Sequence, residues 1–206
     1  MKYFFDKKSN AFLVEGIHTI TTDAITVTAE FYEQAIEARA SGAEIYVESG
    51  EVRISAPRPS PYHERVGRLW QLKDSGKQAQ LLAQRVQVRK QINAKRDECV
   101  NGGVYVHQID KWVDTDEKGQ ANLVQIKADF DLNGKEQEFS LICADNSVYQ
   151  LNYESFKAVW NAVRELKTKM FENAYMHKIL LEQNNNPLEY DWSLGWAKTY
   201  EETINE

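Results

Sequence analysis

Short runs of alternating apolar and polar residues dominate the first sixty positions. Tyr3–Phe5 and Ala11–Ile17 flank a polar turn, which predicts a β-hairpin. Glu44–Glu48 and Glu51–Ile54 alternate around the pair Ser49–Gly50, which predicts a second hairpin with a two-residue turn. This part of the chain is therefore expected to form a small β-rich module over residues 1–60.

A short helix is expected between the two hairpins. The β-branched residues Thr26–Thr28 precede its apolar positions, and Gly42 stands where a C-terminal cap belongs. Three of the four prolines then follow closely, at Pro57, Pro59 and Pro61. Because proline fixes its own φ and restricts the preceding residue, this stretch should be extended and semi-rigid, and it predicts a domain boundary.

A helical period begins after the prolines and predicts a proline-led linker and long helix over residues 61–100. Val66, Leu69 and Leu72 fit one helical stripe, and Gly76 is expected to interrupt or kink the helix. Beyond it, apolar positions recur at spacings of seven, four and seven residues on a charged surface: Leu81, Val88, Ile92 and Cys99. So narrow a stripe predicts a long helix that packs against one partner.

Residues 101–206 predict an α+β domain. Short strands are expected on either side of a turn at Asp110, and Asp116 is a candidate N-cap for a helix that runs to about Asp131. A hairpin follows around Asp145–Asn146, and then a strongly amphipathic helix. That helix places apolar residues at three- and four-residue steps: Phe156, Val159, Trp160, Val163, Leu166, Met170 and Ala174. The predicted fold class for the whole chain is α+β.

Composition narrows the classes of function. Of 206 residues, 42% are apolar, so the chain can bury a core, and the net charge of −6 argues against binding to nucleic acid. Basic residues gather over Arg85–Arg96, but Asp97 and Glu98 follow directly, as on a solvated helix face. No apolar run approaches the roughly 20 residues needed to cross a bilayer, so membrane insertion is not expected.

The side chains that could carry chemistry form no recognisable site. The four histidines are scattered, and the spacing of the two cysteines from them does not suggest the three or four ligands of a zinc site. Asp114–Gly119 resembles the start of a calcium loop, but Lys118 and Gln125 occupy positions where oxygen ligands and a glutamate are required. We therefore expect no catalytic, cofactor-binding or metal-binding residues, and a protein that is not an enzyme.

Two parts of the chain resemble known phage proteins. Met1–Phe5 through Phe12, Ile25–Phe31, Ser41–Gly42 and Val47–Pro61 resemble in their order the start of phage tail-fibre assembly proteins. The later part resembles a phage domain of uncharacterised function that commonly lies at the C-terminal end of such proteins. The segments that carry this second resemblance are Arg89–Asp97, Gly102–Val104, Asp114–Lys118, and Ala144–Asn146 followed by Leu151. Trp70–Gln84 is unmatched.

The resemblance implies a non-enzymatic chaperone or cofactor for a trimeric tail fibre, with the C-terminal region of the fibre as the expected partner. Such a protein would act in the host cytoplasm during virion assembly, and some members stay attached to the fibre tip in the virion tail. The alternative is a structural component of the particle, such as a fibre adaptor or a receptor-binding tip. A homo-oligomer is compatible with both.

Two candidate surfaces could bind the partner. The tail carries Trp192 and Trp196, and such residues are enriched in interface hot spots. The competing site is the stripe formed by Leu81, Val88 and Ile92, which suits helix pairing with a fibre or with another copy. A structural alternative for the tail is that it folds back over an open edge of the C-terminal sheet.

Overall fold

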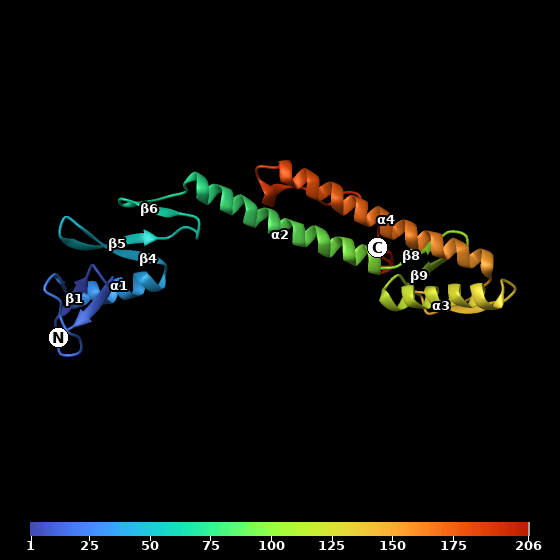
Figure 1. The fold of residues 1–206 in the computed structure, drawn as a ribbon, viewed down its shortest axis with the longest axis horizontal. Coiled ribbons are helices and arrows are strands. Elements are labelled where there is room, and N and C mark those ends of the chain that lie inside the picture. The colour runs from blue at the N-terminus through green and yellow to red at the C-terminus, as the bar shows by residue number, and fades with distance from the viewer. Residues whose placement is uncertain (206) are drawn as a thin grey trace. The chain divides into compact units, whose positions relative to one another are not determined.

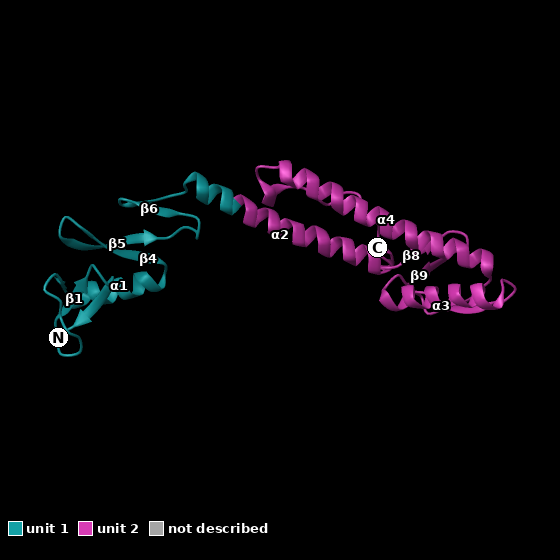
Figure 2. Cartoon of the chain, in the orientation of Figure 1, with its two compact units in different colours: residues 1–80 teal, residues 81–206 magenta. Residues whose placement is uncertain are grey.

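A computed structural model describes residues 1–205 of the chain, and its elements are helices and short antiparallel hairpins. The predicted α+β class is confirmed. The chain divides into two compact units, residues 1–80 and residues 81–206, coloured separately in Figure 2. Unit 1 therefore extends beyond the predicted 1–60 module, and helix α2 (Asp74–Asn101) begins in unit 1 and continues into unit 2.

Unit 1 combines one helix with short sheets (Figure 1). Strand β1 lies between β2 and β3 in an antiparallel sheet, and the pairs β4–β5 and β6–β7 form separate hairpins. The elements are β1 (Tyr3–Asp6), β2 (Ala11–Val14), β3 (Ile25–Val27), α1 (Ala29–Ala40), β4 (Ala43–Glu48), β5 (Glu51–Pro57), β6 (Glu64–Val66) and β7 (Leu69–Gln71).

Both predicted hairpins of unit 1 are confirmed, and backbone conformation explains their turns. Asn10 has φ of 52°, while Ser49 and Gly50 have φ of 51° and 80°. Two consecutive residues with positive φ form the turn whose twist matches that of paired strands. The buried core of the unit consists of Phe5, Ala35 and Ile45, which join β1, α1 and β4.

The predicted helix does not begin at Tyr62, because residues 64–71 form the hairpin β6–β7 instead. Three-residue spacing of apolar positions suggested a helix, but contacts distant in the sequence favour strands. Arg65 pairs with Glu44 at 2.9 Å, and the indole nitrogen of Trp70 donates to the carbonyl oxygen of Ala56 at 2.8 Å. Gly67, with φ of 61°, lies in the turn between strands β6 and β7.

Gly76 does not kink the long helix, contrary to expectation. It lies in the first turn of α2, where a Cβ would come within 2.2 Å of the carbonyl oxygen of Tyr62. Glycine is therefore required here because the preceding chain approaches the helix closely. The free-energy cost of glycine in a helix is small at a terminal turn.

Unit 2 is built from helices and two hairpins. Strand β8 pairs with β9 and β10 pairs with β11, and an N–H of Ala144 donates to the carbonyl oxygen of Trp112 to link the two hairpins at 3.0 Å. Besides the rest of α2, the elements are β8 (Val104–Val106), β9 (Lys111–Val113), α3 (Glu117–Asn133), β10 (Phe139–Ile142), β11 (Val148–Leu151), α4 (Tyr153–Gln183), the 3-10 helix η1 (Pro187–Glu189) and α5 (Tyr200–Ile204).

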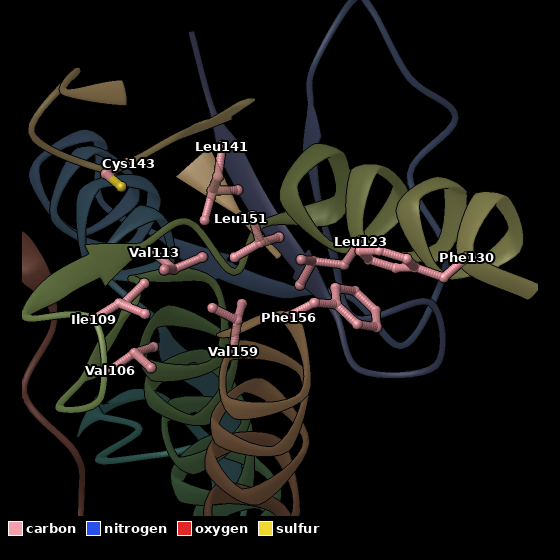
Figure 3. Close-up of a cluster of buried hydrophobic side chains, with 10 residues drawn as sticks. All are labelled: Val106, Ile109, Val113, Leu123, Phe130, Leu141, Cys143, Leu151, Phe156 and Val159. Atoms are coloured by element: carbon pink, nitrogen blue, oxygen red, sulfur yellow. The ribbon is translucent and has the colours of Figure 1, made fainter. Parts of the chain in front are cut away.

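The predicted N-cap of α3 is confirmed, and α4 also begins with a side-chain cap. Asp116 accepts the N–H of Gly119 at 2.7 Å at the start of α3, and Asn152 and Ser155 cap α4 reciprocally. The two hairpins, α3 and α4 enclose the largest buried cluster, shown in Figure 3. Its members are Val106, Ile109, Val113, Leu123, Phe130, Leu141, Cys143, Leu151, Phe156 and Val159. Trp160 packs at the edge of this cluster and stays partly exposed.

Candidate interaction surface

The apolar stripe predicted to bind a partner faces inward. Val88 is 2% exposed and Ile92 is 0% exposed, and they form one cluster with Ala174 and Leu181 of α4. Leu81, at the start of the stripe, is half-buried. A partner cannot reach a side chain that has almost no exposed surface. Val88 and Ile92 therefore belong to the packing within unit 2 and form no exposed surface on it.

The tail residues Trp192 and Trp196 pack on the same cluster, so the structure brings the two competing candidate sites together. Both side chains are half-buried, and Tyr190 joins them. The tail folds back onto unit 2, mainly over α2 and α4, and its end also reaches the hairpin β8–β9, where the Tyr200 ring lies 5.8 Å from that of Trp112. The segment Tyr190–Trp196 thus stabilises the pair of helices α2 and α4. Its aromatic rings remain partly exposed to solvent.

A buried histidine fixes the tail on α4. His177, 8% exposed, makes a 2.8 Å hydrogen bond through Nδ1 with the Tyr190 hydroxyl and a 2.9 Å bond through Nε2 with the carbonyl oxygen of Leu194. A carbonyl only accepts, so Nε2 carries a proton and, in the neutral ring, Nδ1 accepts from Tyr190. Trp196 stacks on the imidazole with ring centroids 5.7 Å apart. Burial raises the pKa of Tyr190, and the charge of Asp191 raises it further.

Much of the basic run of α2 is engaged in contacts within unit 2. Arg85 donates to the main-chain oxygen of Glu182, and Arg89 pairs with the carboxylate of the same residue at 2.6 Å. Lys95 pairs with Glu202 at 2.8 Å, and this hydrogen bond raises the pKa of Lys95. These pairs are partly exposed, so each contributes little stability. They do fix which side of α2 faces α4.

The outer side of α4 exposes two rows of large apolar side chains. Phe171, Tyr175 and Ile179 follow one another at four-residue steps, and Met176 and Leu180 form a second row beside them. Their exposed fractions are 45%, 63%, 36%, 52% and 46%, in that order. We call these five residues the α4 outer face. The buried residues Met170, Ala174, His177 and Leu181 occupy the opposite side of the helix.

Helix α2 adds to this exposed surface. The two helices run antiparallel (Figure 1), since Arg85 contacts Glu182 while the Arg96 guanidinium lies 4.6 Å from the centre of the Phe171 ring. Leu82 and Val86, 60% and 43% exposed, lie on α2 three residues before Arg85 and Arg89, which both pair with Glu182 of α4.

Residues 83–194 match a family described as a domain of unknown function, DUF4376. The match covers more than half of the chain. The chain belongs to this family. The DUF4376 segment extends from α2 through the tail to Leu194, and it therefore contains the α4 outer face as well as the His177 contacts. Neither the curated proteins nor the solved structures contain a match to the chain.

Sequence reasoning missed the α4 outer face of the DUF4376 segment, although a signal for it was present. Leu166, Met170 and Ala174 mark the buried row of α4 at four-residue steps, and the residues from Phe171 to Ile179 repeat the same spacing on the other side of the helix. A helix with apolar residues on both sides is either buried all round or has a partner.

The DUF4376 segment contains a groove of about 590 Å³ between α3 and β10. Asp114 and Asp116 line it, and burial, followed by the charge of Asp116, raises the pKa of Asp114. Among residues 1–205, no group of three or more histidine, cysteine or acidic side chains is placed to hold a metal ion. Over the same residues, no helix combines the length and apolar character needed to cross a membrane.

Proposed function

We propose that this chain is a tail-fibre assembly protein of a tailed phage, a non-enzymatic chaperone that binds the trimeric fibre and helps it to fold or caps it. The observation that carries this proposal is the α4 outer face, which is an apolar surface suited to protein association. Such a protein would act in the host cytoplasm during assembly.

The contacts of the reactive side chains support a binding protein over an enzyme. His177 holds the tail, His63 bonds to Ser60 at 2.8 Å, and His18 accepts the N–H of Val14 at 3.0 Å. Each of these imidazoles takes part in a local contact that the fold itself uses. The two thiols, Cys99 and Cys143, are buried at 0% and 1% exposure, and burial raises both pKa values, which disfavours the nucleophilic thiolate.

The resemblance of the N-terminal part to tail-fibre assembly proteins supplies the identity of the partner. Its quoted segments map onto β1, β2, β3 with the start of α1, and the β4–β5 hairpin, all in unit 1. Family membership of the second part adds no function, because DUF4376 carries no functional description.

Co-expression with the fibre encoded beside this chain tests the proposal. We expect the fibre to be recovered as a soluble trimer only when the chain is present, and to be captured by an affinity tag on the chain. Tyr175→Glu should abolish this rescue, whereas Leu132→Glu on α3, where the side chain is 82% exposed, should not. A fibre that folds equally well without the chain would contradict the proposed function.

Analysis of purified particles distinguishes the chaperone from a virion component. A transient chaperone is absent from particles, whereas an adaptor or tip protein is present in a multiple set by the symmetry of the tail. Quantitative mass spectrometry of particles supplies this number. The chaperone proposal fails if a phage that does not express the chain still assembles complete fibres.

A further inference from the structure

We propose that the α4 outer face, together with Leu82 and Val86 of α2, binds a second copy of this chain, so that two antiparallel helix pairs close into a dimer. This inference concerns the free protein and rests on the proposed function in one respect: it uses the same α4 outer face, so a fibre that binds there would displace the second copy. It depends on three features of unit 2: the area of the surface, the pattern of its side chains and the position of the tail.

The exposed area is close to what a stable dimer needs. The seven side chains of the surface are between 36% and 63% exposed. Since a whole large side chain offers about 150–250 Å², these fractions amount to roughly 500–900 Å². A typical specific interface buries about 800 Å² on each partner, and the largest apolar patch of a monomer is usually about 300–600 Å². The area therefore fits one protein partner per chain.

The pattern of the surface is self-complementary. The row Phe171, Tyr175 and Ile179 is a ridge at four-residue steps, which packs into the groove beside the same ridge of another helix. A twofold axis near Tyr175 would set Phe171 of one copy against Ile179 of the other.

The segment that could most simply cover this surface is fixed elsewhere. The tail packs on the opposite side of α4 through His177, and its end is held by a 2.7 Å hydrogen bond from the N–H of Tyr200 to the carbonyl oxygen of Gly102. Thr199 is buried beside Gly102, where a Cβ on the glycine would come within 2.3 Å of its methyl carbon. The tail is thus committed to the other side of the helix pair.

Light scattering coupled to size-exclusion chromatography tests the dimer on the chain alone, without any fibre. We expect a mass twice the 23.8 kDa of the chain, falling toward one chain on dilution. Tyr175→Glu should weaken the dimer about a hundredfold or more, because each dimer then buries two carboxylates at its centre. Leu132→Glu, an equally drastic change at an exposed leucine on α3, should leave the dimer intact.

A cysteine introduced near the twofold axis provides a second test. Both native cysteines are buried, so they should not compete in mild oxidation. Tyr175→Cys should form a disulfide-linked dimer rapidly, and Gln91→Cys, exposed on the far side of α2, should not.

A monomer at every concentration, or a dimer that tolerates Tyr175→Glu, would overturn the inference, as would equally fast cross-linking at both cysteine positions. Circular dichroism must show that each variant keeps its helices. All of these measurements use the chain without a fibre, so a monomeric chain that still rescues the fibre would overturn the dimer and leave the proposed function standing.

Discussion

Replacing Trp196 with alanine should destabilise unit 2, because this one side chain joins the tail to both long helices. Its indole stacks on His177 with an interplanar angle of 19°, and its Nε1 donates to the carbonyl oxygen of Trp192 at 2.7 Å. The ring also packs against two buried clusters, one around Ile92 and the other around Met170. Alanine removes all of these contacts at once.

The expected cost follows from these contacts. Truncating a fully buried aromatic residue to alanine typically costs about 3–5 kcal/mol, and Trp196 is only partly buried, so we expect about 2–4 kcal/mol. Trp196→Phe keeps an aromatic ring over His177 but loses the indole hydrogen bond, which contributes about 1 kcal/mol. The phenylalanine variant should therefore lie between the wild type and the alanine variant.

Urea unfolding followed by far-ultraviolet circular dichroism measures this cost, since the long helices of unit 2 dominate that signal. Tryptophan fluorescence is less suitable because the chain has five tryptophans. Leu194→Ala is the matched control in the same tail, because Leu194 is 70% exposed and should change stability by less than about 0.5 kcal/mol. If Trp196→Ala costs no more than this control, the tail does not stabilise the helix pair and our reasoning is refuted.

Three further predictions follow from the same structure. Truncation after Asn186 should destabilise unit 2 by more than Trp196→Ala does, and a truncated chain with an unchanged melting temperature would show that the tail is dispensable. Cys99 and Cys143 should react slowly with a thiol reagent in the native chain and fully after denaturation, and fast native labelling of either would contradict its burial. Hydrogen bonds from Ser147 lower the pKa of Asp145 from 3.8 to about 2. Because the ionised carboxylate is favoured in the folded chain, its stabilisation is present above pH 3.8 and is lost as the pH falls toward 2. The difference in melting temperature between wild type and Asp145→Ala should therefore disappear over that range, and a constant difference would refute the assignment.

Local physical chemistry determined many of the elements that the sequence predicted correctly. The Ser49–Gly50 turn and the Asp116 cap each depend on residues within a few positions of one another. Turn conformations and caps are short-range effects, so their patterns can be read without knowing what packs nearby. The same holds for the buried row of α4, whose period is a property of one helix.

Only the tertiary structure decided which neighbours each element meets. The segment around Gly67 has the spacing of a helix but becomes a hairpin, because Arg65 and Trp70 find partners in β4 and β5 that lie more than ten residues away in the sequence. From the sequence alone, the apolar side chains of Val88 and Ile92 could contact a partner protein or belong to a buried core. They are buried because the tail and α4 cover them, whereas Tyr175 on the other side of α4 stays exposed. A sequence pattern shows that a helix has an apolar face, but packing determines whether that face is covered by the same chain.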